Sequence, residues 1–446
     1  MSKEKEIQGF SKMTKTEKIQ WIAKNFLYSN PIDVIKEFTG FWHDNIEAQK
    51  LLDGFSENTI TNFPIPFGIA PNFLINGEMY AVPMVIEESS VVAAASNAAK
   101  FWMTRGGFKA KVLSTTKVGQ VHFTFDGNKE TFTHIFNSEF KQKLLNTVKP
   151  ITANMEKRGG GVKGIDLIDL SELEMDYFQL RCYFETVDSM GANFINSCLE
   201  EFGKTLVELV SADPRFQVED SSIEVIMCIL SNYTPECLVK VEVECPVDNL
   251  GSFDDGKMKA REFATRFAKA VRIAQIDPYR ASTHNKGIMN GIDAVVIATG
   301  NDFRAIESCV HTFAARDGQY RSLSECKIEN DVFNFSLTVP LALGTVGGLT
   351  SLHPLAKRTL EVLGNPTASR LMEIVASVGL AQNFAAVRSL TTTGIQKGHM
   401  KMHLTNILAS MQASDEETIL ARAYFESKTI SVAGVRDFLQ SLREKK

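Results

Sequence analysis

The stretch 277-DPYRASTHNKGIMNGIDAVVIATGND-302 joins a polar half, punctuated by glycines, to an apolar half. The polar half contains Arg280, Lys286 and Asn290, and the run 294–298 that follows is apolar. Such a run is typical of a buried strand or of a piece of core helix. The chain then turns and leaves Asp302 at the edge of the core. A lysine near apolar surroundings with a carboxylate close by is how proteins hold a charged, aimed amine, although a surface loop before a core strand explains the same residues equally well.

The composition describes a large globular chain. With 446 residues, 44% of them hydrophobic, it can bury a sizeable core and is expected to form two or three domains. The formal net charge is −5 at pH 7. Nucleic-acid binding depends on counterion release by an excess of basic residues, so we expect no nucleic acid among the partners.

Cysteine and histidine patterns argue against a metal site. The seven cysteines, at positions 182, 198, 228, 237, 245, 309 and 326, show no CxxC-like pairing. This scatter favours free thiols in a reducing cytoplasm and disfavours cysteine-ligated zinc. His399 and His403 have the i, i+4 spacing of a metal-binding pair, but no third ligand is evident. We therefore expect surface histidines and no metal.

No segment is expected to enter a membrane. The N-terminal sequence MSKEKEIQGFSKMTK is charged and lacks the apolar region of a secretory signal. The longest uncharged stretch, 332–352, is broken by Pro340 and several glycines, so it predicts a strand and a glycine loop. The sequence therefore predicts a soluble, cytoplasmic protein.

Capping signals place helices at both ends of the chain. Thr14 with Glu17, and Ser414 with Glu417, have the spacing of capping boxes. Asn30 before Pro31 predicts an N-cap followed by proline at the first helical position. The two N-terminal helices are interpreted as scaffold or as a dimer surface, and a last helix is expected over 432–443.

Two adjacent carboxylates, Glu87 and Glu88, lie between a predicted hairpin and a predicted helix. The hairpin turns at Asn76-Gly77, and the alanine-rich helix covers 91–102. Carboxylates at a helix N-terminus are stabilised by the helix dipole, and this structural explanation is favoured by the sequence alone. A carboxyl group pressed against apolar surface could instead act as an acid.

Residues 107–215 have the pattern of a separate insert. The alternation over 109–125 predicts a hairpin that turns at Gly119, and 138–157 is expected to be helical with a break at Pro150. Two strands are expected over 165–186, and the sequence after Asp188 opens a helix to about residue 211. This order is consistent with a small ferredoxin-like α/β sandwich.

Two glycine-containing stretches remain ambiguous. The loop Gly344–Gly348 lacks the spacing of a P-loop or of a GxGxxG fingerprint. Gly347 and Gly348 form either a tight turn or a place where the backbone approaches a ligand closely. The sequence 391-TTTG-394 is a plausible hinge before a segment that moves as a unit.

Seven motifs, taken together and in this order, resemble the hydroxymethylglutaryl-coenzyme A reductases of the soluble bacterial class II. They are ENTI (57–60), EESSVVAAAS (87–96), DSMGAN (188–193), DPYRASTHNKGIMNG (277–291), ATGND (298–302), GTVGG (344–348) and GHMKMH (398–403). The resemblance implies an α+β fold with a large α/β domain, an inserted ferredoxin-like domain and a C-terminal helical flap. We expect the large domain, for substrate, coenzyme A and dimerisation, at 1–106 and 216–375. The dinucleotide-binding insert is expected at 107–215 and the flap at 376–446.

The resemblance also implies functional residues. The catalytic positions fall on Glu88 (with Glu87 as the fallback), Lys286, Asp302 and His399. Substrate-binding positions fall on Arg280, Ser90 and Asn290, and cofactor-binding positions on Asp188, Met190, Gly191 and Asn193. In the family, lysine stabilises the oxyanion that hydride attack creates on a thioester, and the flap histidine protonates the coenzyme A thiolate. The glutamate donates the last proton, the aspartate holds the lysine, and Arg280 would bind the substrate's carboxylate. The family's active site forms at a dimer interface, so a homodimer is expected.

The cofactor is expected to be NADPH or NADH. Lys157 and Arg158, before the triple glycine, favour the 2′-phosphate of NADPH, whereas Glu156 favours NADH. All three could equally be solvated helix-end charges. Two other functions are compatible with the sequence: another NAD(P)-dependent acyl-CoA reductase on this scaffold, and a coenzyme A-binding homologue without catalysis.

Overall fold

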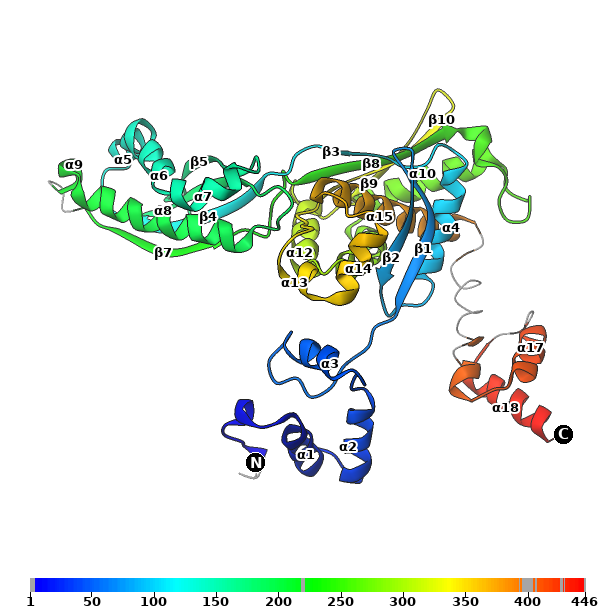
Figure 1. Ribbon diagram of the computed structural model, residues 1–446. Helices are drawn as coiled ribbons and strands as arrows, with labels where there is room; N and C mark the ends of the chain where they lie inside the picture. The colour runs from blue at the N-terminus through cyan, green and yellow to red at the C-terminus, as the bar shows by residue number, and fades with distance from the viewer. Residues whose placement is uncertain are drawn as a thin grey trace. The chain divides into compact units, whose positions relative to one another are not determined.

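The computed structural model describes residues 5–217, 221–392, 394, 404–405, 407–425, 428 and 430–444 (Figure 1). The chain divides into two compact units, Met1–Pro66 and Phe67–Lys446.

The N-terminal unit is helical. Its elements are η2 (Phe10–Lys12), α1 (Lys15–Phe26), α2 (Pro31–Gly40) and α3 (Ile46–Asp53). The capping box predicted at α1 is present: the Thr14 hydroxyl accepts from the Glu17 backbone, and the Glu17 carboxylate accepts from the Thr14 backbone at 2.7 Å. Asn30 caps α2, with Pro31 in its first turn. Local capping chemistry thus fixes where both helices begin.

Two β-structures form the frame of the second unit. A hairpin consists of β1 (Phe67–Ile75) and β2 (Glu78–Val85), and its turn at Asn76-Gly77 confirms the prediction. Both turn residues have positive φ, 52° and 84°, as a two-residue hairpin turn requires. An antiparallel sheet has the order β3 (Lys109–Val112), β8 (Leu238–Pro246), β10 (Val332–Pro340) and β9 (Ser324–Glu329).

Helices complete the main core. They are α4 (Val91–Met103), η4 (Val247–Leu250), α10 (Ala260–Ile276), α11 (Pro278–Ala298), α12 (Phe303–Ala314), α13 (Gly348–Leu352), α14 (Pro354–Val362) and α15 (Ala368–Thr391). Side chains from α4, α10, α11 and α15 share one buried cluster with the hairpin and the sheet. This packing buries most of α15 and the apolar side of α11.

Helix α11 corrects the loop interpretation of the stretch that bears Lys286. Residues 278–298 form one continuous helix, so the apolar run 294–298 is core helix and not a strand. Asp277 caps the helix by accepting from the Tyr279 backbone, and Pro278 occupies its first turn. Glycine is needed at position 291 because α15 lies so close that an added Cβ would be 2.8 Å from the Val378 carbonyl oxygen.

The insert has ferredoxin-like topology, as predicted. Its elements are β4 (Lys117–Phe125), α5 (Lys129–Ile135), η3 (Phe136–Phe140), α6 (Lys141–Thr147), α7 (Lys149–Glu156), β5 (Gly161–Asp169), β6 (Tyr177–Glu185), α8 (Ala192–Ala212), α9 (Pro214–Gln217) and β7 (Ile223–Leu230). The sheet order β5-β6-β4-β7 combined with this chain order is the split β-α-β arrangement. Figure 1 shows α8 running along the sheet, and a phenylalanine-rich core separate from the main one holds the insert together.

Two expectations about the insert differ from the structure. The hairpin at Gly119 is wrong, because Gly119 lies inside β4, and β3 belongs to the other sheet. Gly119 serves packing instead: an added Cβ would lie 2.6 Å from a Leu199 methyl group on α8. The insert's sheet also continues past residue 215, because β7 pairs with β4.

The C-terminal part contains α17 (Asp415–Tyr424) and α18 (Val432–Arg443), which share a small apolar core with residues from Leu404 onward. The capping box of Ser414 and Glu417 and the helix over 432–443 are as predicted. The flap boundary expected at 376 falls inside α15, which stays buried in the main core as far as Val387. No helix within the described residues is long and apolar enough to cross a membrane.

Candidate active site

Lys286, Asn290 and Glu88 meet at one point. Lys286 and Asn290 lie one turn apart on α11, so their side chains leave the same face of the helix. Lys286 Nζ is 2.6 Å from Glu88 Oε2, and Asn290 Nδ2 donates to the same oxygen at 3.2 Å. The lysine side chain is 61% exposed and the glutamate 38%. The three residues therefore form a solvent-accessible, polar contact that a ligand can reach.

The backbone beside Glu88 is strained. Ser90, the N-cap of α4, has φ 76° and ψ −16°, and its hydroxyl makes no capping hydrogen bond. A non-glycine residue in this left-handed region costs energy and is concentrated at functional sites. This geometry leaves the Ser90 hydroxyl without a capping role beside the polar contact. In the sequence, only the position of Ser90 directly before the predicted helix indicated its place in the site.

Arg280 lies six residues before Lys286 on the same helix and is half-buried. No hydrogen bond of its guanidinium is present within the described residues. Burial lowers the pKa of Arg280. Burial and the charge of Arg280 together lower the pKa of His284 to about 3, so His284 is neutral at pH 7 and its Nε2 bonds to Ser324 Oγ at 2.7 Å. Arg280 is thus a partly desolvated cation available to an anionic ligand.

Asp302 does not contact the lysine directly. It caps α12, and its carboxylate accepts from the Arg304 and Ala305 backbones and pairs with the Arg304 guanidinium at 3.1 Å. Burial acts to raise the pKa of Asp302, but these hydrogen bonds outweigh it and hold the pKa below its usual value. No hydrogen bond joins Asp302 to Lys286 or Glu88 within the described residues. The structure therefore brings together Glu88, Lys286 and Asn290 but leaves Asp302 with Arg304.

A cavity of about 710 Å³ connects Asp302 with the insert. Its lining includes Met190, Gly191 and Asn193 from the DSMGAN motif, Asp302 and Arg304, and Gly347. Gly191 is the N-cap of α8 and has φ 85°. An added Cβ there would lie 2.4 Å from Thr186 Cγ2, which explains why glycine is needed. The N-terminus of the 21-residue helix α8 thus opens at this cavity.

Asp188 acts on neighbouring backbone. Its Oδ1 accepts from the Ala368 backbone at the start of α15 at 2.7 Å, and its carbonyl accepts from Thr345 at 2.8 Å. The GTVGG loop approaches so closely that a Cβ on Gly344 would lie 2.5 Å from the Met190 nitrogen. The two motifs therefore hold each other. The two interpretations of the glycine loop concerned Gly347 and Gly348, which have positive φ (82° and 56°) and no described atom within 4 Å of an added Cβ, as in a turn. The close approach occurs at Gly344, and it is to protein.

Sequence reasoning missed two cations near this cavity. Arg304 pairs with Asp302 and lines the cavity; its position two residues after the aspartate was the available signal. Lys117 is buried beneath the DSMGAN motif, and no sequence pattern distinguished it from a surface lysine. Arg158, which the sequence did single out, lines the same cavity. His399 lies outside the described residues.

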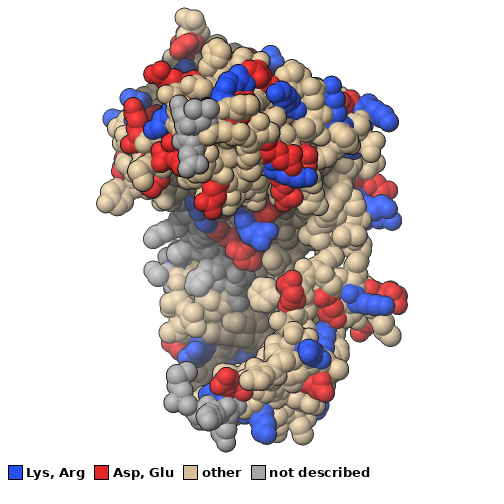
Figure 2. Space-filling view, turned by 90° about the vertical axis from the view of Figure 1, so that its left-hand side faces the viewer, with Lys and Arg blue, Asp and Glu red and all other residues tan. Residues whose placement is uncertain are grey.

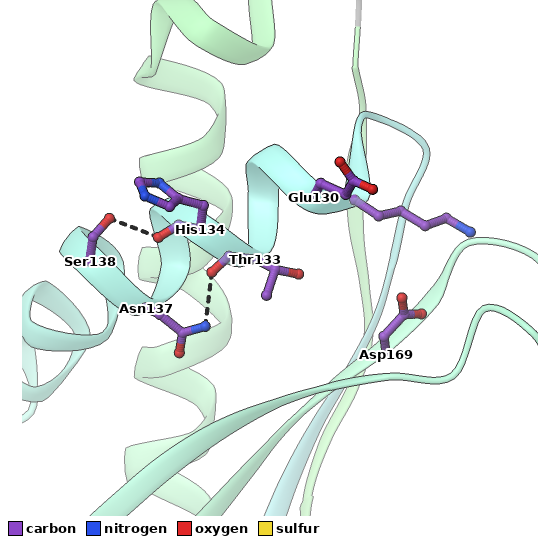
Figure 3. Close-up of a pocket in the computed structure, with 7 residues that line it drawn as sticks. Glu130, Thr133, His134, Asn137, Ser138 and Asp169 are labelled. Carbon is purple, nitrogen blue, oxygen red and sulfur yellow. Dashed lines mark hydrogen bonds between the residues drawn. The ribbon is translucent and has the colours of Figure 1, made fainter.

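A second cavity, of about 610 Å³, lies on the insert and is not a candidate site. It is lined by α5, η3 and the end of β5 (Figure 3). Ser138 Oγ donates to the His134 carbonyl at 2.7 Å, and Asn137 Nδ2 donates to the Thr133 carbonyl at 2.9 Å. The side chains of Ser138 and Asn137 are therefore engaged by the backbone of their own helical segment.

Figure 2 shows acidic and basic side chains interspersed on the face that it presents.

The chain matches one family over most of its length. A family profile described as hydroxymethylglutaryl-coenzyme A reductase matches residues 16–404. The 3-hydroxy-3-methylglutaryl-coenzyme A reductase of Archaeoglobus fulgidus is 34% identical over 421 residues, covering 92% of this chain and 88% of that protein. The probable reductase of Borreliella burgdorferi is 31% identical over 395 residues, covering 87% and 86%.

Solved structures give the same result. The 3-hydroxy-3-methylglutaryl-coenzyme A reductase of Streptococcus pneumoniae is 36% identical, with a TM-score of 0.71, covering 98% of this chain and 99% of that one. A structure described as the class II enzyme of this organism bound to NADPH in open conformations has a TM-score of 0.70 at 36% identity, covering 86% and 99%. These matches cover most of both chains, so they concern the whole protein and not one domain.

Proposed function

The chain belongs to the hydroxymethylglutaryl-coenzyme A reductase family, and from this premise we propose that it reduces 3-hydroxy-3-methylglutaryl-CoA to mevalonate and free coenzyme A. Each turnover consumes two NADPH and two protons. The observation that carries the proposal is the contact of Lys286 Nζ with Glu88 at 2.6 Å, made between two motifs of the family. The same catalyst runs in reverse when mevalonate is degraded.

The cavity beside the insert fits the dinucleotide. Its volume of about 710 Å³ is within the range of small-molecule sites. The N-terminus of α8 presents free backbone N–H groups, which suit phosphate. Arg158 adds positive charge to the lining, where Arg304 is already paired with Asp302, and this charge favours NADPH over NADH. When bound, the reduced nicotinamide supplies the hydride; Met190, Gly191 and Asn193 would contact the cofactor.

Lys286 stabilises the oxyanion in this proposal. Hydride addition to the thioester carbonyl places negative charge on its oxygen, and an ammonium group aimed at that oxygen stabilises the charge better than water does. Glu88 Oε2 accepts from Lys286 Nζ, and Asn290 donates to the same oxygen and so helps to fix the carboxylate that positions the lysine. Because Lys286 is fixed on a buried helix, little reorganisation is needed during the reaction.

Arg280 and Ser90 bind the acyl part of the substrate. The guanidinium of Arg280 has no hydrogen-bonding partner in the described part of the chain, and it is half-buried, which strengthens a bidentate bond to the substrate's free carboxylate. Ser90 offers a hydroxyl that is not used for capping. Together they orient the thioester toward Lys286.

Protons come from two sources in the proposed mechanism. His399 protonates the coenzyme A thiolate when the hemithioacetal collapses. The pair of Glu88 and Lys286 delivers the proton that the alkoxide takes up after the second hydride transfer. Asp302 exchanges its Arg304 partner for Lys286 and thereby adjusts the proton affinity of the pair of Glu88 and Lys286. The product then leaves as mevalonate.

An absorbance assay of nicotinamide oxidation tests the proposal. Purified protein is given hydroxymethylglutaryl-CoA or acetyl-CoA, each with NADPH or NADH. We expect turnover with hydroxymethylglutaryl-CoA and a higher kcat/KM with NADPH. Turnover with acetyl-CoA alone would identify another acyl-CoA reductase, and no oxidation with either thioester would leave a coenzyme A-binding homologue without catalysis.

We also propose a cytoplasmic homodimer. All seven cysteines are free thiols, which suits a reducing compartment. The N-terminal unit exposes apolar side chains, among them Tyr28, Ile46 and Phe63, and such surfaces mark protein interfaces. Sedimentation equilibrium of the full chain tests the assembly, and a monomer at micromolar concentration would contradict it.

A further inference from the structure

Lys117 is a buried cation for which the proposed mechanism has no use. It is the first residue of β4 and only 4% exposed. No carboxylate within the described residues lies within ion-pair distance of its Nζ. Burying a charge without an ion-pair partner is costly unless hydrogen bonds compensate, so the contacts of Lys117 require an explanation.

Both hydrogen bonds of Lys117 go to the turn that precedes α8. Its Nζ donates to the Ser189 carbonyl at 2.8 Å and to the Thr186 hydroxyl. The Thr186 hydroxyl in turn donates to the same Ser189 carbonyl at 2.6 Å. The ammonium group therefore joins the two ends of the segment 186–189, directly before Met190 and Gly191.

This segment holds a strained residue. Val187 has φ 53°, and a β-branched residue in the left-handed region is a genuine outlier. Such a conformation is costly and persists only where the surroundings over-determine it. The Val187 backbone N–H is bound by Glu185 Oε1 at 2.8 Å, and Lys117 holds the residues on either side. The cation thus ties Thr186 and Ser189 together around the strained residue.

We infer that Lys117 is a positioning residue for the dinucleotide: it holds the turn 186–189 in the strained shape that presents Met190, Gly191 and the N-terminus of α8 to the cofactor cavity. The inference rests on the proposed function of that cavity. Lys117 itself does not line the 710 Å³ cavity. Its effect is therefore expected on cofactor affinity and not on the chemical step.

The charge of Lys117 makes this effect dependent on pH. Burial lowers the pKa of Lys117, whereas Cys237, Glu185 and Asp188 act in the opposite direction. Burial raises the pKa of Cys237 to about 12, so its thiol stays neutral in the range of interest. Lys117 therefore loses its proton at a lower pH than an exposed lysine, and its bonds to the turn weaken as pH rises.

The central variants are Lys117→Met and Lys117→Arg, with Lys204→Met as the matched control. Methionine keeps the apolar stem and removes the ammonium donor, so the Ser189 carbonyl keeps only the Thr186 hydroxyl and the turn loses the link to β4. Lys204 lies on α8 and is exposed, 4.0 Å from Glu208. We measure NADPH binding to the full chain without thioester by calorimetry, and then kcat and both KM values.

Lys117→Met is expected to raise the NADPH Kd about tenfold or more, with kcat at saturating NADPH and the KM for the thioester changed less than about threefold. Lys204→Met is expected to leave all four values unchanged. If Lys117→Met does not fold, Thr186→Val, which removes the bridging hydroxyl, is expected to raise the Kd several-fold. An unchanged NADPH Kd in the folded variant would overturn the inference. Changes in kcat and in the KM for the thioester as large as the change in the NADPH Kd would overturn it as well.

A pH series provides the readout that a purely structural role would not move. Between pH 7 and pH 10 the NADPH Kd of the natural protein is expected to rise more steeply than that of Lys117→Arg, because arginine stays charged. Equal slopes would refute a role for the charge. Binding of NADPH without turnover of hydroxymethylglutaryl-CoA would contradict the proposed function and leave this inference intact, so the two failures are distinguishable.

Discussion

At the scale of single residues, Lys286 is the one on which the chemistry depends. It reaches Glu88 from a helix fixed in the main core. Lys286→Ala is expected to reduce kcat for both the thioester and the free aldehyde by at least about 100-fold, because each step builds charge on oxygen. Lys269→Ala, on the exposed side of α10, is the control. Steady-state assays with both substrates decide it; an unaffected aldehyde step would remove Lys286 from the second hydride transfer.

His399 is assigned from the sequence alone, and its predicted effect differs from that of Lys286. Protonation of a thiolate is needed only when coenzyme A leaves. His399→Gln is therefore expected to lower thioester reduction by about 10²–10⁴-fold while sparing reduction of the free aldehyde. Parallel assays with the two substrates measure this. Equal losses in both would contradict the thiolate role.

Asp293 makes a prediction about stability. It lies on α11 beside Glu307 of α12, and burial together with this second carboxyl group raises the pKa of Asp293 well above its usual value. The native state therefore binds more protons than the unfolded state above about pH 4, so this group's contribution to stability falls as pH rises toward the folded pKa.

Asp293→Asn removes this titration and keeps the shape. The difference in Tm between variant and natural protein is expected to increase from pH 5 to pH 8 by at least about 2 °C. Asp317→Asn is the control: the Arg321 side chain lowers the pKa of Asp317, so this carboxylate is ionised in both states from pH 5 to pH 8 and the Tm difference of this variant should stay constant. Differential scanning fluorimetry measures both. A difference independent of pH would show that Asp293 is ionised in the native state.

At the scale of elements, α11 shows what sequence patterns can and cannot predict. The motif residues Lys286 and Asn290 were singled out from the sequence, and the structure places the side chains of both at Glu88. The continuous helix 278–298 was not predicted, because its polar half and its glycines are typical of a loop. Packing decides the outcome, since α15 covers Gly291, and long-range packing leaves no local signal. The partner of Asp302, in contrast, had a local signal that was missed, because Arg304 follows the aspartate by two residues.

The close crossing of α11 and α15 gives a matched pair of glycine substitutions. Gly291→Ala is expected to destabilise the protein by about 1–3 kcal/mol, because its Cβ would meet the Val378 carbonyl at 2.8 Å and Gln382 Cβ at 2.9 Å. Gly287→Ala, with no atom within 4 Å of the added Cβ, is expected to stabilise by up to about 1 kcal/mol from helix propensity. Urea unfolding compares them. Equal effects would show that the helices separate easily.

At the scale of the whole molecule, the sequence predicted the ferredoxin-like insert but not its limits. Strand and helix order follows from local patterns such as those of 165–186 and 192–211. The limits depend on which strand pairs with which. β3 joins β8 and β7 joins β4 although the paired residues are about 100 or more positions apart in the sequence, and alternation within one strand says nothing about its neighbours. The same limitation placed the flap boundary at 376, inside α15.

The separate cores of the insert and the main body predict separate unfolding. Phe178 is fully buried in the core of the insert, and Phe335 is fully buried in the main one. Each substitution to alanine costs about 3–5 kcal/mol. Because neighbouring cores share few apolar contacts, a loss in one opens that unit first.

Hydrogen exchange measured by mass spectrometry tests this expectation. Phe178→Ala is expected to lose amide protection over 117–217 and 221–230 while α11 and α15 keep theirs, and Phe335→Ala is expected to do the reverse. NADPH should restore protection at the start of α8 in Phe178→Ala, since ligand binding to the native state opposes opening. Loss of protection in α11 on substitution of Phe178 would mean that insert and main body unfold as one cooperative unit, and the dinucleotide site could not then be tuned without disturbing Lys286.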